Sequence, residues 1–215
     1  MSLSRRSKVD PFIVMDVMES AARAEAEGRH IIHMEVGQPG TPAPAGARAA
    51  LTKAMADDAL GYTVALGLPA LRQKIASLYG ERYGVDLSPD RVIVTAGSSG
   101  AFLLSFTALF DAGERVALGA PGYPSYRQIL GALSLQAVDI PTRLEDRFQP
   151  VPETLPDDIQ GLIVASPANP TGTMLDKPAL SALIRAASER GAAFVSDEIY
   201  HGIEYGRSAV SSLQI

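Results

Sequence analysis

Residues 161–200 read GLIVASPANPTGTMLDKPALSALIRAASERGAAFVSDEIY, and they hold most of the information on the fold. The pattern predicts two short apolar strands, at 162–165 and 193–196, with a helix over 177–190 between them. Both strands are almost entirely apolar, which is typical of strands covered on both faces. A strand, a helix and a second strand in this order form the repeating unit of a parallel sheet, so the stretch predicts an α/β fold.

The same alternation extends upstream of residue 161. Further apolar strands are predicted at 92–95, 115–118 and 135–140. A glycine- and serine-containing turn, Gly97–Gly100, opens an apolar helix that runs through Phe110, and a second helix is predicted over 123–133. The residues from 91 onward therefore predict one mostly parallel sheet flanked by helices.

The N-terminal part of the sequence favours helices instead. Asp10-Pro11 is a typical helix start, with Asp10 as the N-cap, and Gly28 is a plausible end of that helix. A short extended segment is predicted over 30–36. Two more helices are predicted, over 44–55 and from Pro69 onward.

The composition narrows the class of protein. The chain has 215 residues, no cysteine, three histidines and a formal net charge of −5. The lack of cysteine excludes disulfides, zinc–thiolate sites and thiol nucleophiles, and the acidic balance argues against a nucleic-acid partner. No apolar run approaches the roughly 20 residues of a membrane helix. We therefore expect a cytoplasmic protein without a membrane or metal partner.

Candidate ligand-binding residues follow the predicted strands, where open α/β sheets bind their ligands. After successive strands come the turn Gly97–Gly100, the ring of Tyr123, the amide of Asn169, and Asp197 with Tyr200. Glycines allow close approach of the backbone, and free amides at a helix start attract phosphate. A phosphorylated aromatic heterocycle would use all of these groups.

Each candidate on its own has an ordinary structural explanation. Gly97–Gly100 is compatible with a plain strand–helix turn. Tyr123 fits a packing aromatic, and Asn169 before a proline fits a turn residue. Asp197 fits a helix N-cap. His201 is expected at the surface or in a hydrogen bond.

The order and spacing of the motifs together are more specific. Ser166–Gly172 and, about 25 residues later, Ser196–Tyr200 resemble the fold-type I, class I/II pyridoxal-phosphate (PLP) aminotransferases. Pro121–Tyr126, Gly61–Thr63 and Glu35–Pro39 fall in the order of that family as well. The resemblance covers essentially the whole sequence from Pro11 onward.

This resemblance implies a three-layer α/β/α large domain with a mostly parallel sheet. The sheet would be incomplete at its C-terminal side. Residues 1–40 would form an N-terminal arm and part of a small domain, and residues 41–215 the N-terminal portion of the large, PLP-binding domain.

The resemblance also implies roles for the strand-end residues. Asp197 would pair with the protonated pyridine nitrogen of PLP, which keeps the ring able to accept electrons. Asn169 and Tyr200 would hydrogen-bond the phenolic oxygen of the cofactor. Tyr123 would stack on the face of the pyridine ring.

Further roles fall on small residues and on a second tyrosine. Gly97, Ser98 and Ser99 would hold the phosphate of PLP. Gly37 would approach the substrate carboxylate through its backbone. Tyr62 would reach the phosphate of the neighbouring subunit's cofactor, since the active sites of the family lie at the interface of a homodimer.

The lysine that forms the Schiff base in this family has no counterpart here. The sequence has four lysines, and none lies in the serine-rich context of the family's reactive lysine: Lys8, Lys53, Lys74 and Lys177. We therefore assign no catalytic residue within the 215 residues. We expect the reactive lysine beyond Ile215, in an enzyme about twice as long, and expect the segment by itself to be inactive.

The function implied is transfer of an amino group between an L-amino acid and a 2-oxo acid by ping-pong chemistry. Two alternatives remain open: a PLP-dependent C–S lyase on the same scaffold, and a non-catalytic PLP-binding effector or vestigial fragment. The residues do not identify which amino acid or oxo acid is used.

Overall fold

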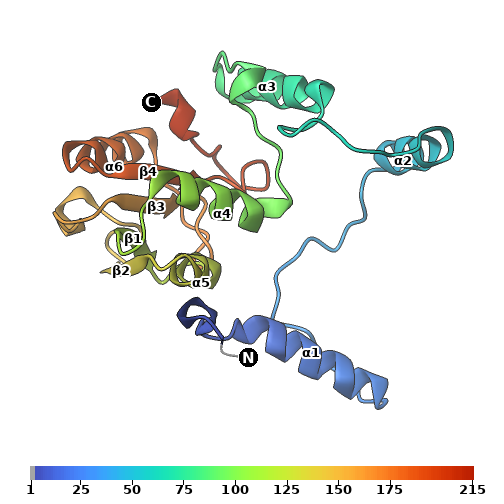
Figure 1. The fold of residues 1–215 in the computed structure, drawn as a ribbon, viewed down its shortest axis with the longest axis horizontal. Coiled ribbons are helices and arrows are strands. Elements are labelled where there is room, and N and C mark those ends of the chain that lie inside the picture. Colours follow the sequence, from blue (N-terminus) through green and yellow to red (C-terminus); the bar gives the residue numbers. More distant parts are fainter. Residues whose placement is uncertain (1–2) are drawn as a thin grey trace. The chain divides into compact units, whose positions relative to one another are not determined.

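The computed structural model describes residues 3–215 and divides the chain into two compact units. The sheet unit comprises Met1–Asp10 and Pro69–Ile215, and the helical unit comprises Pro11–Leu68. Both can be followed by colour in Figure 1. Met1 and Ser2, the start of the predicted arm, lie outside the described residues. The predicted division into residues 1–40 and 41–215 stays a prediction.

The sheet unit alternates helices and strands along the chain. Its longer helices are α3 (Pro69–Tyr83), α4 (Gly97–Leu109), α5 (Pro124–Ala132) and α6 (Lys177–Glu189). Its strands are β1 (Arg115–Ala120), β2 (Gln136–Pro141), β3 (Gly161–Ala165) and β4 (Ala193–Asp197). Short 3-10 turns lie at Arg5–Ser7, Pro89–Arg91 (η2), Pro152–Thr154 and Ser212–Gln214. These elements confirm the predicted helices of this unit.

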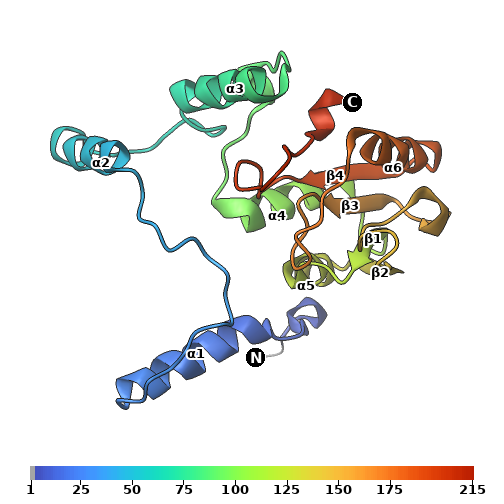
Figure 2. The same ribbon diagram turned by 180° about the vertical axis from the view of Figure 1, so that it is seen from behind.

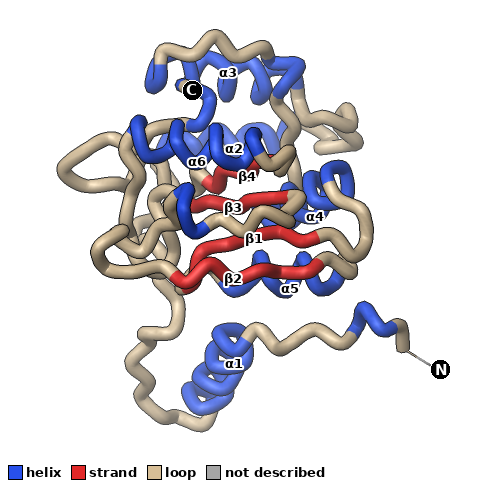
Figure 3. The backbone as a smooth tube through the Cα atoms, turned by 90° about the vertical axis from the view of Figure 1, so that its left-hand side faces the viewer, coloured by secondary structure: helices blue, strands red, loops and turns tan. Residues whose placement is uncertain are grey.

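The four strands form one parallel sheet in the order β2-β1-β3-β4. β1 pairs with β2 and β3, and β3 pairs with β4. The strands run side by side in Figure 2 and in the tube of Figure 3. The strands predicted at 115–118, 135–140, 162–165 and 193–196 are therefore confirmed.

Helices cover both faces of the sheet, because successive side chains of a strand point to opposite faces. On β3, Leu162 and Val164 pack in a cluster with the apolar side of α6, whereas Ile163 packs in a second cluster with α4 and α5. Figure 3 shows α6 on one side of the strands and α5 on the other. The result is the predicted three-layer α/β/α arrangement.

The predicted strand over 92–95 is wrong. Val92 is extended, with φ −102° and ψ 124°, but residues 92–95 pair with no strand among residues 3–215. Ile93 is 59% exposed, unlike a central-strand residue. An apolar run becomes a strand only when a second strand meets it in register, and that pairing is a property of the tertiary structure.

The Arg72 side chain bonds the backbone at the start of this segment and just before it. Arg72 on α3 donates from Nε to the Val92 carbonyl at 2.9 Å and from Nη2 to the Pro89 carbonyl at 2.7 Å. The Arg72 side chain is 11% exposed, whereas its ion-pair partner Asp90 is 95% exposed. The two backbone bonds therefore fix the course of the chain from α3 toward α4.

Replacing Arg72 with methionine is expected to lower the free energy of unfolding by about 1–3 kcal/mol, because two backbone carbonyls lose their donor. Urea unfolding of the full-length protein measures the change. Lys74→Met on the same helix is the matched control, since the Lys74 side chain is 72% exposed. Equal effects of the two substitutions would contradict the role given to Arg72.

The helical unit contains α1 (Ile13–Ala26) and α2 (Ala45–Asp57). Gly28, with φ +85°, follows the end of α1 as predicted. The predicted N-cap is wrong: α1 begins at Ile13 and its N-cap is Phe12, which makes no side-chain cap bond. Asp10 lies three residues before the first helical residue, too far along the chain to cap its first amides. The segment 30–36 forms no strand.

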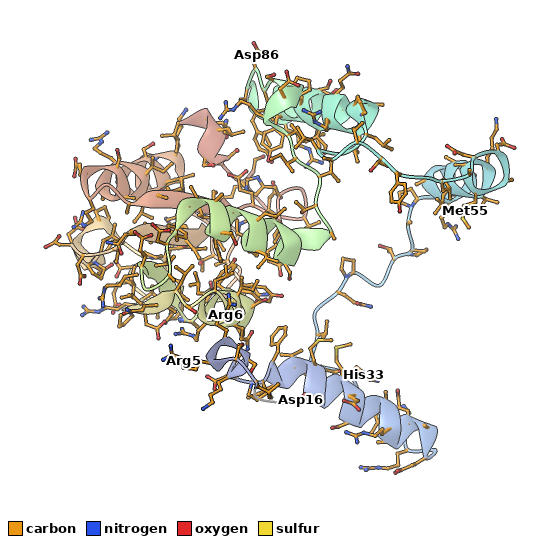
Figure 4. The ribbon with its side chains drawn as sticks, viewed as in Figure 1. Arg5, Arg6, Asp16, His33, Met55 and Asp86 are labelled. Carbon is orange, nitrogen blue, oxygen red and sulfur yellow. The ribbon has the colours of Figure 1, made fainter. Side chains whose placement is uncertain are left out.

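His33 of the helical unit lies near α1 in Figure 4, and its ring contacts two carboxylates. Its Nδ1 is 2.6 Å from Glu35 Oε1, and its Nε2 is 2.9 Å from Glu25 Oε1. Carboxylate oxygens only accept, so both ring nitrogens must carry a proton. The bond to Glu35 first, and then the bond to Glu25, raise the pKa of His33 from 6.5 to about 9.

Titration of the His33 ring, followed by NMR, is expected to have its midpoint at about 9. Because the folded pKa exceeds the unfolded one, the stabilisation is fully present below pH 6.5 and is lost as the pH rises through about 9. Glu35→Gln should lower the midpoint further than Glu25→Gln. A wild-type midpoint near 6.5 would show that the two bonds do not form.

Among residues 3–215, no helix combines the length and apolar character needed to cross a membrane.

Candidate functional site

A cavity of about 100 Å³ lies at the carboxyl ends of β3 and β4. Its lining comes from the last residues of β3 and β4, from the turns after β1, β3 and β4, and from the starts of α4 and α5: Ser98, Tyr123, Tyr126, Ala165, Asn169, Asp197, Ile199 and Tyr200. This is where parallel sheets bind ligands, because the loops after neighbouring strands meet there. The structure thus brings together five residues singled out from the sequence: Ser98, Tyr123, Asn169, Asp197 and Tyr200.

Asp197 is the last residue of β4, and both of its carboxylate oxygens accept hydrogen bonds. The Tyr126 hydroxyl donates to Oδ2 at 2.5 Å, and the Ile199 amide donates to Oδ1 at 3.1 Å. Residues 199–202 form a turn rather than a helix, so Asp197 is not a helix N-cap. The two bonds hold the carboxylate in one orientation at the wall of the cavity.

Tyr126 is a site residue to which the sequence reasoning gave no role. It is 4% exposed, and burial first, then its hydrogen bond to Asp197, raise the pKa of its hydroxyl. The hydroxyl therefore stays protonated and keeps donating to the carboxylate. A signal was present in the sequence: Tyr126 lies three residues after Tyr123, one helical turn along α5. The two rings meet edge to face, with centroids 5.4 Å apart.

Asn169 and Tyr200 are joined side chain to side chain. Asn169 Nδ2 donates to the Tyr200 hydroxyl oxygen at 3.1 Å. The turn that carries Asn169 is itself bonded to β4, because the Ser166 amide donates to the Asp197 carbonyl at 3.2 Å. The peptide bonds before Pro167 and Pro170 are cis. The amide and the phenol thus form one polar group on the wall beside Asp197.

The Gln149 side chain holds the same turn by hydrogen bonds. It is 3% exposed, and its Nε2 donates to the Ala165 carbonyl and to the Thr173 carbonyl, both at 3.2 Å. One buried amide thereby bonds to both sides of the loop that begins at Ser166. This contact was not anticipated from the sequence, and no local pattern around Gln149 indicates it.

The predicted phosphate turn lies at the start of α4. Gly97 has φ +72°, a conformation that glycine adopts without steric cost. The N-cap Ala96 makes no side-chain cap bond, so no side chain of the cap residue occupies the first amides of α4. Ser98 lines the cavity, whereas Gly97 and Ser99 are exposed and do not line it.

Two further predicted residues belong to the helical unit. Tyr62 is fully exposed within the described chain, and nothing lies within 4 Å of the position that a Cβ on Gly37 would take. Their predicted contacts with a partner subunit's cofactor and with a substrate carboxylate stay predictions.

Within residues 3–215, the cavity has neither a lysine nor a cluster of metal-ligating side chains. None of the four lysines lines the cavity. In the same described range, no group of three or more His, Asp or Glu residues is arranged to hold a metal ion. The groups that face the cavity are a carboxylate, an amide, phenols and a serine hydroxyl. This donor set fits a flat polar ring that carries a positive charge beside Asp197.

Comparison with known proteins adds an independent line of support. The sequence profile of the family described as "Aminotransferase class I and II" matches residues 29–214. A valine–pyruvate aminotransferase of Mycobacterium tuberculosis is 45% identical over 203 residues, which cover 93% of this chain and 52% of that protein. The chain spans about half the length of the curated relatives it matches.

Solved structures agree with the sequence relatives. The sequence is 65% identical to that of a protein from Silicibacter pomeroyi whose crystal structure matches this one with a TM-score of 0.90. The match covers 100% of this chain and 55% of the chain from Silicibacter pomeroyi. The structure of the aspartate aminotransferase of Thermus thermophilus with maleate matches with a TM-score of 0.92 at 30% sequence identity. This match covers 98% of this chain and 56% of the Thermus thermophilus chain. At these identities the likeness extends beyond the fold to the family.

Proposed function

This chain belongs to the class I and II aminotransferase family, and on that basis we propose that the full-length protein is a PLP-dependent aminotransferase. It would transfer an amino group between an L-amino acid and a 2-oxo acid. The names of the relatives favour this activity over a C–S lyase or a non-catalytic PLP-binding fragment. The relatives are named for valine–pyruvate and for aspartate, so the proposal stops at the substrate class.

One observation carries the proposal: a carboxylate at the end of a buried strand, held by two hydrogen bonds and facing a cavity. Asp197 would hold the protonated ring nitrogen of PLP by its negative charge. When bound, PLP supplies a ring that withdraws electrons from the substrate. Tyr126 and the Ile199 amide keep Asp197 oriented, with bonds of 2.5 Å and 3.1 Å.

The remaining residues would orient the cofactor. Asn169 and Tyr200, already bonded to each other at 3.1 Å, would bind its phenolic oxygen. Tyr123 would cover one face of the ring. Ser98, with Gly97 and Ser99, would bind the phosphate through hydroxyls and the free amides at the start of α4.

The finer features of the family are proposals as well. The full-length protein would be a homodimer with shared active sites, in which Tyr62 reaches the cofactor phosphate of the neighbouring subunit. Gly37 would approach the substrate carboxylate. The reactive lysine would lie outside residues 1–215, because none of Lys8, Lys53, Lys74 and Lys177 lines the cavity. A cytoplasmic location stays a prediction from the sequence.

Reductive trapping tests the proposal. The full-length protein is incubated with PLP, reduced with borohydride and digested, and the modified peptide is identified by mass. We expect one modified lysine, outside residues 1–215. No PLP adduct, or an adduct spread over surface lysines such as Lys74, would contradict the assignment.

A further inference from the structure

A buried histidine next to the site belongs to a network that the proposed function does not use. The His201 side chain is 6% exposed, and the neighbouring Glu198 side chain is 13% exposed. His201 Nε2 lies 2.9 Å from the Ser166 carbonyl oxygen, and Nδ1 lies 2.7 Å from the Tyr83 hydroxyl. The hydrogen-bonding role expected for this histidine is confirmed, and a surface position is excluded.

The bond to Ser166 identifies the ring nitrogen that donates. A carbonyl oxygen only accepts, so Nε2 must carry the proton that is donated to Ser166. In the neutral ring, Nδ1 then accepts from the Tyr83 hydroxyl. Burial raises the pKa of Tyr83, so this hydroxyl keeps its proton. Glu198 Oε2 is 3.7 Å from Nδ1, and Glu198 Oε1 accepts from Ser212 N at 2.7 Å.

These bonds connect three parts of the sheet unit that carry or lead to the site. Ser166 begins the turn that presents Asn169, and His201 directly follows Tyr200. Tyr83 is the last residue of α3 and lies 118 residues away from His201 in sequence. Asn169 and Tyr200 face the cavity from two different turns, and His201 is the side chain that joins the backbone of both.

We propose that His201 is a positioning residue: through its bond to Ser166 it sets the separation of Asn169 and Tyr200, and thereby the affinity for the cofactor ring, while its bond to Tyr83 joins these turns to α3. This role depends on the proposed function in one respect: PLP is taken to be the ligand of Asn169 and Tyr200. His201 lines no part of the cavity and would touch neither cofactor nor substrate.

Two amide substitutions distinguish the roles of the two ring nitrogens of His201. The side-chain nitrogen of glutamine is three bonds from Cβ, like Nε2 of histidine, so His201→Gln can still donate to Ser166. The amide of asparagine ends two bonds from Cβ, like Nδ1, so His201→Asn loses that bond. The two variants have similar polarity, and they differ in the contact that the proposal invokes.

The first measurement is PLP affinity of the full-length protein, from the absorption change on titrating the apo form. His201→Asn and His201→Ala are expected to weaken PLP binding by about tenfold, the effect of one lost hydrogen bond, and His201→Gln to restore it to within about threefold. His30→Ala, an exposed histidine of the helical unit, is the control. Wild-type affinity in His201→Asn, or no rescue by His201→Gln, would overturn the proposal.

The second measurement needs no cofactor. The free energy of unfolding of the apo form is compared for His201→Ala, Tyr83→Phe and the double variant. A coupling between the two substitutions is expected because their side chains share a hydrogen bond. Additive effects would overturn the network. If the wild type binds no PLP, the proposed function fails, and this coupling still decides whether His201 joins α3 to the turns.

Discussion

Asp197→Ala in the full-length protein is expected to lower the proposed aminotransferase turnover by several powers of ten and to weaken retention of PLP. Removing one partner of a desolvated charge pair costs roughly 3–5 kcal/mol, equivalent to about 10²–10⁴ in affinity. Removing the carboxylate also deprives the buried Tyr126 hydroxyl of its acceptor, which lies at 2.5 Å. Steady-state turnover and PLP titration measure the two effects.

Two companion variants sharpen this result. Asp197→Asn keeps the shape and an acceptor for Tyr126 but removes the charge, so it should impair turnover nearly as much as alanine. Tyr126→Phe keeps the charge and loses one hydrogen bond to it, so its effect should be about tenfold. Asp157→Ala, with a side chain that is 96% exposed, is the control. Normal turnover in Asp197→Asn would contradict the charge-based role.

The second large effect is on stability. Phe106→Ala is expected to lower the free energy of unfolding by about 3–5 kcal/mol, the usual cost of emptying the space of a buried phenyl ring. Phe106 is fully buried, with Phe102 at 5.6 Å and Phe110 at 6.1 Å between ring centroids. Phe102 and Phe106 lie on α4, Phe110 follows its last residue, and the three rings pack in one cluster with residues of β1 and β3.

The adjacent residue supplies a matched control for Phe106. Thr107 is exposed, and its hydroxyl bonds only to the Leu103 carbonyl of its own helix. Thr107→Ala should therefore change the free energy of unfolding by no more than about 0.5 kcal/mol. Denaturant unfolding of the apo full-length protein gives both values. A small loss in Phe106→Ala would show that α4 is not held by this cluster.

Part of the site could be predicted because it depends on local features. Residues at and directly after the ends of parallel strands meet at one edge of the sheet, so recognising β3 and β4 also located Asn169 and Asp197. Tyr126 was missed because its role depends on a hydrogen bond to a residue 71 positions away. His201 was expected only as a surface or hydrogen-bonding residue, because its partners Tyr83 and Ser166 lie 118 and 35 positions away in sequence.

From the sequence alone came the order of α3–α6 and β1–β4 and the burial of the sheet on both faces. Both follow from the spacing of apolar residues, which indicates how many faces of each helix or strand are buried. The tertiary structure alone decided which partners complete the buried polar groups. It left Val92–Thr95 without a strand, bonded Val92 to Arg72, and placed Tyr126 on Asp197 and His201 on Ser166. A buried donor or acceptor must find a partner, but the spacing of residues along the chain does not specify which remote group the fold brings within reach.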